Sequence, residues 1–275
     1  MPDLVVHRSM GEKVLSRLPF DMPEKEIFRY ALSGPDDWSC CRFYLPWRWL
    51  RYRRRAGIMH EQKTGVFLNA LAETAKQAEG REKDLLFAYT AGFLCHFYLD
   101  STAHPYILRR TERNSSNHTA FERELDRLEM ERMGIRGRRP VSGLLTLDAL
   151  PVEMKAGLEK AYGVYGWDDT WRALNMAMRD ARRFLRMTED PYGLWNRAFF
   201  WSRRMQVFSY RHREYAHQDP ENESRAYGEE SFSEMVKRSA SAAAERIILL
   251  WQSVYRGGPW AGMTDISYTT GTCVC

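Results

Sequence analysis

The fold of this chain is decided by the stretch Leu85-Leu-Phe-Ala-Tyr-Thr-Ala-Gly-Phe-Leu-Cys-His96-Phe-Tyr-Leu-Asp100-Ser-Thr-Ala-His104-Pro105. It is almost wholly apolar, yet His96, Asp100 and His104 recur at intervals of four residues. Four residues of an α-helix turn through about 400°, so neighbours in this series lie about 40° apart on one face. Burying a carboxylate and two imidazoles costs several kcal/mol unless something pairs with them, and a divalent metal ion pairs with all three. The stretch therefore predicts a buried helix with a metal-binding stripe.

The next part of the chain carries a second pair of ligand-type residues. Because the residue before a proline avoids the α region, we predict that the first helix ends at Pro105, which places His104 at its C-terminal end. His118 and Glu122 then stand four residues apart at the start of another helix. The loop between the helices is polar, turn-rich and short. The two helices are therefore expected to lie side by side.

Helical periodicity extends over nearly the whole chain, and period-2 strand patterns are scarce. We predict an all-α fold, a multi-helix bundle in one domain over residues 1–255, followed by a flexible tail over residues 256–275. Ser231 and Glu234 have capping-box spacing at the start of the last long helix. The expected helices cover residues 5–17, 24–33, 46–55, 61–79, 83–103, 118–133, 147–163, 169–186, 190–204 and 231–255.

The composition is that of a globular protein with ample material for a core. The chain has 275 residues, of which 44% are hydrophobic, and a net charge of +5, which suits an anionic partner or substrate. Five cysteines, an odd number, argue against a disulfide framework. The N-terminal sequence lacks the features of a secretory signal, and no apolar run reaches the roughly 18 residues of a membrane span. These features predict a cytoplasmic protein with no transmembrane segment.

Further ligand-type residues gather in the first half of the chain. Five of the seven histidines fall within the first 118 residues, among them His7 and His60, and His60 is expected to open a helix. Asp36 and Asp37 stand in a Gly-Pro-Asp-Asp turn. Histidine and carboxylate ligands without thiolate suit Zn²⁺, Mn²⁺ or Fe²⁺.

The linked motifs resemble a known family. The order His7…Gly34-Pro-Asp36…His60…Gly92-x-x-x-His96-x-x-x-Asp100-x-x-x-His104-Pro…Asn114-x-x-x-His118-x-x-x-Glu122 is similar to that of the zinc-dependent phospholipase C family, with fungal single-strand-specific zinc nucleases as more distant relatives. The resemblance covers roughly residues 4–126. It implies an all-α fold with zinc ions clustered in a cleft.

The resemblance also implies a ligand set. One ion would be held by Asp36, His60, His96 and Asp100, a second by His104, His118 and Glu122, and a third by His7 and a bridging Asp100. Secreted members add the amine of a processed N-terminus to the third site. No signal for such processing is evident here, so two or three zinc ions are expected.

The activity implied by the resemblance is hydrolysis of a phospholipid or another phosphodiester by a metal-activated water. Asp36 would orient or deprotonate that water, and Asp37 is the substitute candidate, with simple turn chemistry as its other interpretation. Two alternatives remain open. One is a nuclease or nucleotide phosphohydrolase, and the other is a non-catalytic, metal-binding helical protein.

A basic and aromatic stretch lies between two of the proposed ligands. Residues 46–55 read Pro-Trp-Arg-Trp-Leu-Arg-Tyr-Arg-Arg-Arg, and the arginines from Arg48 to Arg55 would suit peripheral contact with lipid headgroups, or with nucleic acid. The other interpretation is a solvated helix face with aromatic anchors in the core.

Overall fold

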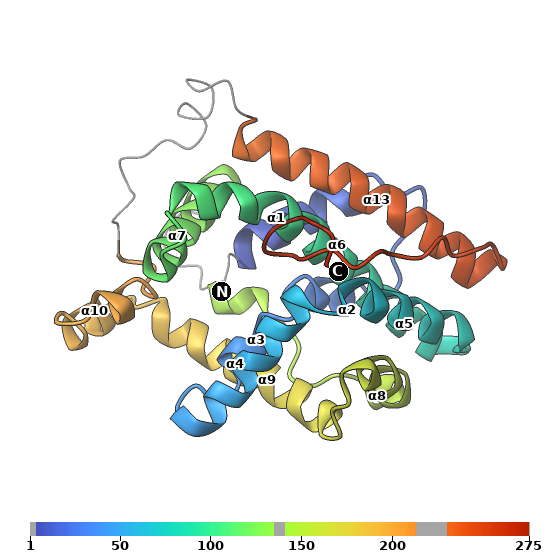
Figure 1. Ribbon diagram of the computed structural model, residues 1–275, viewed down its shortest axis with the longest axis horizontal. Coiled ribbons are helices and arrows are strands. Elements are labelled where there is room, and N and C mark those ends of the chain that lie inside the picture. Colours follow the sequence, from blue (N-terminus) through green and yellow to red (C-terminus); the bar gives the residue numbers. More distant parts are fainter. Residues whose placement is uncertain (1–3, 135–140, 213–229, 275) are drawn as a thin grey trace.

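The computed structural model describes residues 4–134, 141–212 and 230–274 (Figure 1). The all-α prediction is confirmed, since the only β contact in these ranges is an isolated bridge between Ile266 and Cys273. Three short 3₁₀ turns cover Val141–Leu144, Val152–Met154 and Gly163–Tyr165. The α-helices are α1 Leu4–Leu15, α2 Lys25–Ala31, α3 Asp37–Cys40, α4 Pro46–Glu61, α5 Thr64–Gln77, α6 Gly80–Arg110, α7 Ser115–Arg132, α8 Lys155–Tyr162, α9 Thr170–Thr188, α10 Leu194–Ala198, α11 Arg203–Gln206 and α13 Phe232–Arg256.

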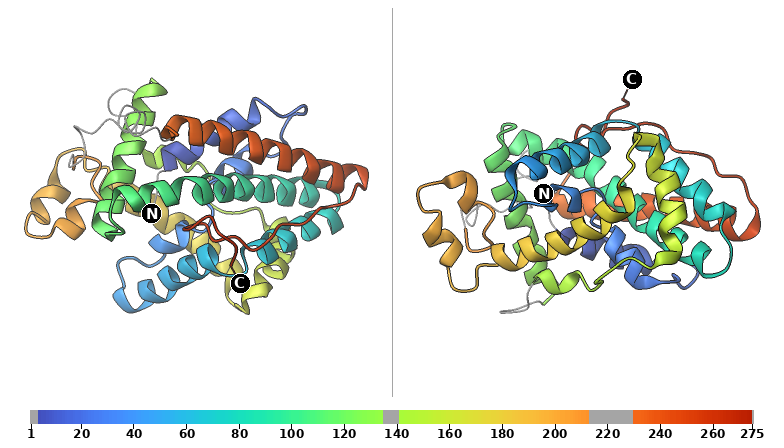
Figure 2. Two further views of the ribbon diagram at one scale, coloured as in Figure 1. Left: turned by 45° about the horizontal axis from the view of Figure 1, so that its top comes forward. Right: turned by 90° about the horizontal axis from the view of Figure 1, so that it is seen from below.

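The helix α6 is the centre of the molecule. Its first half is apolar on every side, as expected of a helix surrounded by others, and from Leu85 to Phe97 every side chain is buried. The neighbours α13, α2, α5 and α1 pack around it, and α13 runs along one side of it in both figures (Figures 1 and 2). This enclosure places His96 and Asp100 in the interior.

The prediction that α6 ends at Pro105 is wrong, because the helix continues to Arg110. An internal proline costs about 3 kcal/mol. Beyond it, Tyr106 and Ile107 are almost fully buried, and burying such side chains contributes roughly 1.5–3 kcal/mol each. Packing therefore offsets the free-energy cost of the missing N–H, and His104 lies within the helix rather than at its C-terminal end.

The prediction of a flexible tail is also corrected. After α13 the chain runs back over the molecule (Figure 1), and Tyr268 is fully buried. The N–H of Tyr268 donates to the carbonyl of His60, and Asn69 bonds both the carbonyl and the N–H of Met263. Gly271 passes so close to the Ser101 carbonyl that a Cβ there would lie 2.4 Å from the oxygen. Ser101 is four residues before Pro105, so its carbonyl lacks the usual helical partner.

Several other boundaries differ from the expected ones. His60 lies in the last turn of α4 instead of opening a helix, and the expected helix over 190–204 is broken into α10 and α11. The capping box at Ser231 and Glu234 is confirmed. None of the described helices combines the length and apolarity needed to cross a membrane.

Candidate metal centre

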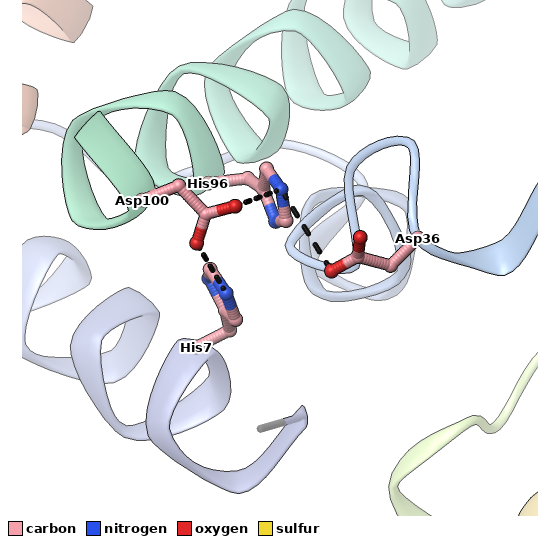
Figure 3. A group of neighbouring side chains, drawn as sticks. All are labelled: His7, Asp36, His96 and Asp100. Carbon is pink, nitrogen blue, oxygen red and sulfur yellow. Dashed lines mark ion pairs between the residues drawn. The ribbon is translucent and has the colours of Figure 1, made fainter. Parts of the chain in front are cut away.

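Four buried side chains from three parts of the chain meet at one point (Figure 3). They are His7 of α1, Asp36 before α3, and His96 and Asp100 of α6, and one ligand atom from each lies within 4.8 Å of the others. The Nε2 atom of His96 is 3.0 Å from Asp100 Oδ2 and 3.9 Å from Asp36 Oδ2. The Nε2 atom of His7 is 3.1 Å from Asp100 Oδ1. This is group 1.

His60 approaches the same carboxylates from the end of α4. Its Nε2 atom is 3.2 Å from Asp36 Oδ1 and 3.6 Å from Asp100 Oδ2. The resemblance assigns His60 to the same ion as Asp36, whereas group 1, whose ligand atoms lie within 4.8 Å of one another, contains His7 in its place. The ring of His7 stacks on that of His96 with centroids 4.3 Å apart, so a single cluster contains all the ligands assigned to the first and third ions.

A close backbone approach brings Asp36 to this cluster. Gly34 has a φ of +52°, and a Cβ at this position would lie 2.4 Å from the ring of His96. An alanine would therefore clash with His96 and would also be strained by the positive φ. Glycine lets the turn lie directly against the imidazole, and Asp36 follows two residues later.

A second group, called group 2 below, lies where α6 meets α7. It contains His104, His118 and Glu122, whose ligand atoms again lie within 4.8 Å of one another. Nε2 of His118 is 2.6 Å from Glu122 Oε1, and Nε2 of His104 is 3.5 Å from the same oxygen. Asp100 links the two groups, because its Oδ2 is 3.7 Å from Nδ1 of His104.

Backbone carbonyls fix three of the imidazole rings. Nδ1 of His60 is 2.7 Å from the Ala56 carbonyl, Nδ1 of His96 is 3.1 Å from that of Leu32, and Nδ1 of His104 is 3.1 Å from that of Tyr268. An Nδ1–H that donates to a carbonyl leaves Nε2 as the free ligand atom. No local pattern in the chain indicates that Tyr268 contributes, because its contact with His104 spans 164 residues.

Two buried atoms without hydrogen-bond partners indicate that zinc fits this donor set. Within the described residues, His96 Nε2 and Asp100 Oδ2 are buried and have no hydrogen-bond partner, although they face each other at 3.0 Å. If Nδ1 carries the ring proton, the two atoms direct lone pairs at one another. A cation between them removes that repulsion, and imidazole and carboxylate are both ordinary zinc ligands.

Group 2, together with Asp36 and His60, lines a surface pocket, whereas His7, His96 and Asp100 are buried and do not line it. The pocket has a volume of about 200 Å³, and its walls include Asp36, His60, His104, His118, Glu122 and Arg53. The position of Arg53 in the wall of this pocket was not expected from the sequence. It precedes His60 by seven residues, two helical turns, and this spacing on one face could have revealed it.

Comparison with known families agrees with this geometry. The model of a family described as zinc dependent phospholipase C matches residues 6–172, more than half of the chain. The chain belongs to this family. Neither the search of curated proteins nor that of solved structures finds a match. For this member of the zinc dependent phospholipase C family, the family match supports a zinc-dependent hydrolase, and the two ligand groups are candidate zinc sites.

Neighbouring charges shift the ionisation of the ligands in the metal-free protein. Burial alone would lower the pKa of His60, but its contacts with Asp100 and Asp36 raise it to about 10. Burial likewise opposes the shift at His104, where Asp100 and Glu122 raise the pKa to about 9. Burial would raise the pKa of Asp100, but the surrounding histidines hold it well below its usual range. In the absence of metal, protons on the imidazoles balance the carboxylates.

Asp37 is placed differently from Asp36. It is buried outside both ligand groups, in contact with Ser33 and Tyr30, and desolvation raises its pKa to about 7. Asp36, in contrast, lines the pocket. Of the two candidates for a catalytic carboxylate, only Asp36 faces the space where a substrate would lie.

Asp126 of α7 positions the start of α1. Its Oδ1 accepts from the N–H groups of Val5 and Val6, at 3.1 and 3.0 Å, and its Oδ2 accepts from the hydroxyl of Tyr210 at 2.8 Å. A helix has unpaired N–H groups in its first turn, and a carboxylate there also interacts favourably with the helix dipole. Asp126 therefore connects α1, which carries His7, to α7, which carries Glu122.

We expect Asp126→Ala to lower the free energy of unfolding by about 1–3 kcal/mol, because two buried N–H groups lose their acceptor. Zinc should be lost first from the cluster containing His7. Asp126→Asn keeps an acceptor oxygen and should restore most of the stability. Denaturant unfolding and zinc titration measure both effects. Equal damage from the two substitutions would show that charge, rather than capping, is what Asp126 contributes.

Proposed function

We propose that the protein is a zinc-dependent phosphoric diester hydrolase of the phospholipase C type, acting on a phospholipid. The observation that carries the proposal is the convergence of eight histidine and carboxylate side chains beside an open pocket. Five of them line the pocket, and the other three are buried in contact with these five. We further propose that Asp36, His60, His96 and Asp100 hold one ion and that His104, His118 and Glu122 hold a second, with His7 and Asp100 available to a third. Family membership supports zinc as the metal.

Bound zinc supplies Lewis acidity, which makes water nucleophilic near neutral pH and stabilises charge on phosphate oxygens. In this proposal Asp36, which lines the pocket, takes the proton of the attacking water. Burial would raise the pKa of Asp36, but the hydrogen bond with His60 and the charge of His96 hold it below its usual value, so the carboxylate is ionised at neutral pH. Water adds to phosphorus, the ester bond to the alcohol breaks, and a phosphomonoester and an alcohol result.

Arg53 is the cation in the pocket wall that is free to meet the substrate. It is exposed on α4, and its guanidinium lies over the ring of Trp49, 5.2 Å from the centroid. A guanidinium here can donate to a non-bridging phosphate oxygen. The pocket volume of about 200 Å³ lies below the usual range for sites that enclose a whole ligand, so the acyl chains would stay outside.

Peripheral membrane contact through residues 48–55 is part of the proposal, with one correction. Arg55 is buried and forms an ion pair with Asp169 at 2.6 Å, so it belongs to the core. Arg48, Arg51, Arg53 and Arg54 are exposed, and Trp47 is 87% exposed. Exposed arginines beside an exposed tryptophan are typical of a surface that meets anionic lipid.

The proposal is tested by zinc analysis and by turnover of the protein purified without chelator. We expect two or three zinc ions per chain, release of diacylglycerol from phosphatidylcholine vesicles, and hydrolysis of bis(p-nitrophenyl) phosphate. Arg53→Gln should weaken turnover of the soluble bis(p-nitrophenyl) phosphate, whereas Arg54→Gln, its neighbour outside the pocket, should not.

Two other outcomes would replace the proposal. Cleavage of single-stranded DNA without any release of diacylglycerol would favour the nuclease alternative. A full complement of zinc with no turnover of any phosphodiester would favour the non-catalytic alternative.

A further inference from the structure

A second cavity lies on the opposite face of α4 from the metal centre. Arg51 and Arg53 are two residues apart, about 200° around the helix, so Arg51 faces this cavity while Arg53 faces the metal centre. The cavity has a volume of about 280 Å³ between α4 and α9. We call it the arginine pocket, and its walls include Arg42, Arg48, Arg51, Tyr52, Asp169 and Arg172.

An ion pair between the buried Arg55 and the half-buried Asp169 forms the base of the arginine pocket. Nη1 of Arg55 is 2.6 Å from Asp169 Oδ1, and the Arg55 guanidinium packs among the rings of Trp38, Tyr52 and Trp167 at 4.6–5.4 Å. The charge of Asp169 is therefore already balanced by Arg55. Its other oxygen is 3.6 Å from Nη2 of Arg51. The single carboxylate in the wall thus leaves most of the positive charge of the pocket uncompensated.

One further carboxylate lies near the remaining arginines, that of Asp180, which accepts from the backbone N–H of Arg42 and pairs with Arg183. Among the described residues, no ion pair is formed by Arg48 or Arg172, and Arg42 bonds only the hydroxyl of Tyr44 through its side chain. Like charges gathered around one cavity repel one another, so an anion there stabilises the arrangement. Guanidinium groups bind phosphate oxygens through paired hydrogen bonds, which makes a phosphate group the matching ligand.

The surroundings of the arginine pocket are suited to lipid rather than to a free solute. Trp47 directly precedes Arg48 and is 87% exposed, and Leu50 is 53% exposed. Phe200 and Trp201, which follow α10 in the chain, are also largely exposed. Tryptophan at the headgroup level and arginine at the phosphates are the usual pairing at a membrane surface.

We infer that the arginine pocket binds the phosphate of an anionic phospholipid that is not the substrate, while Trp47 inserts among the headgroups beside it. The site would hold the protein on a membrane without occupying the metal centre. The inference goes beyond the hydrolase proposal and does not require the metal centre to be catalytic.

Binding to phosphatidylcholine vesicles with and without phosphatidic acid tests the inference. Phosphatidic acid is a phosphomonoester, so a diester hydrolase does not consume it. The variant Arg48→Gln/Arg172→Gln should lose at least about tenfold in affinity for the phosphatidic acid vesicles. The matched control Arg54→Gln/Arg179→Gln removes the same charge from the same two helices outside the pocket and should lose clearly less. Both should keep the wild-type zinc content and turnover of a soluble phosphodiester.

Inorganic phosphate and Trp47→Ala separate lipid from free phosphate. Phosphate binding, measured by calorimetry, should weaken in the pocket variant but stay unchanged in Trp47→Ala, which should still lose vesicle affinity. Equal loss of vesicle binding in the two double variants would overturn the inference in favour of general electrostatic attraction. Loss of phosphate binding with unchanged vesicle binding would overturn it in favour of a small phosphate compound.

Discussion

Asp100→Asn should remove most of the bound zinc and lower phosphodiester turnover by more than about 100-fold. Residues that only support a metal ligand already account for 10–100-fold effects, and Asp100 is proposed as a ligand itself. Its oxygens lie 3.1 Å from His7, 3.0 Å from His96 and 3.7 Å from His104, so one side chain serves both groups. Elemental analysis and initial rates measure the two effects.

The control for this experiment is His212→Gln. His212 lies outside both ligand groups, and its N–H donates to the Ser209 carbonyl. We expect its zinc content and turnover to match the wild type. Full zinc content in Asp100→Asn, with circular dichroism showing a folded protein, would contradict the proposed ligand set. Loss of zinc in His212→Gln would require a different site.

Removing the metal should lower the melting temperature by an amount on the order of 10 °C. A ligand present at a thousand times its dissociation constant stabilises the folded state by about 4 kcal/mol, and in a chain of this size each kcal/mol corresponds to roughly 2–4 °C. Calorimetry before and after chelation, with zinc added back, gives the shift. An unchanged melting temperature after complete removal of zinc would contradict coupling between metal binding and folding.

The metal-free protein should also respond to pH with a defined sign. The folded-state pKa values of His60 and His104, about 10 and about 9, lie above the ordinary value of 6.5. Their contribution to the free energy of unfolding is therefore complete below pH 6.5 and is lost as the pH rises through 9 to 10. Asp100 has a lowered pKa, so its contribution is present above pH 3.8 and is lost at more acid pH.

The zinc-loaded protein should lose less stability over the alkaline range, because zinc binds neutral imidazole and takes over the role of the protons. Thermal unfolding at several pH values, with and without zinc, checks the difference. Parallel pH profiles for the two forms would contradict the view that protons and zinc compete for the same imidazoles.

Much of the fold and the candidate site followed from local sequence pattern. The four-residue spacing of His96, Asp100 and His104 on an apolar stretch indicated both the buried helix and its polar stripe. The pair His118 and Glu122 one short loop later indicated the neighbouring helix. These features can be recognised in the sequence because helix geometry alone decides which residues share a face.

Tertiary packing decided the rest. Tertiary packing allows α6 to continue past Pro105, because the burial of Tyr106 and Ile107 offsets the free-energy cost of a proline. It folded the tail back so that the Tyr268 carbonyl meets His104, placed Asp126 on the start of α1, and opposed Arg172 to Arg48 across a cavity. Such contacts join residues more than a hundred positions apart, where periodicity carries no information. The sequence by itself determined which side chains are candidates for the metal chemistry, and only the packing of helices decided what surrounds and supports them.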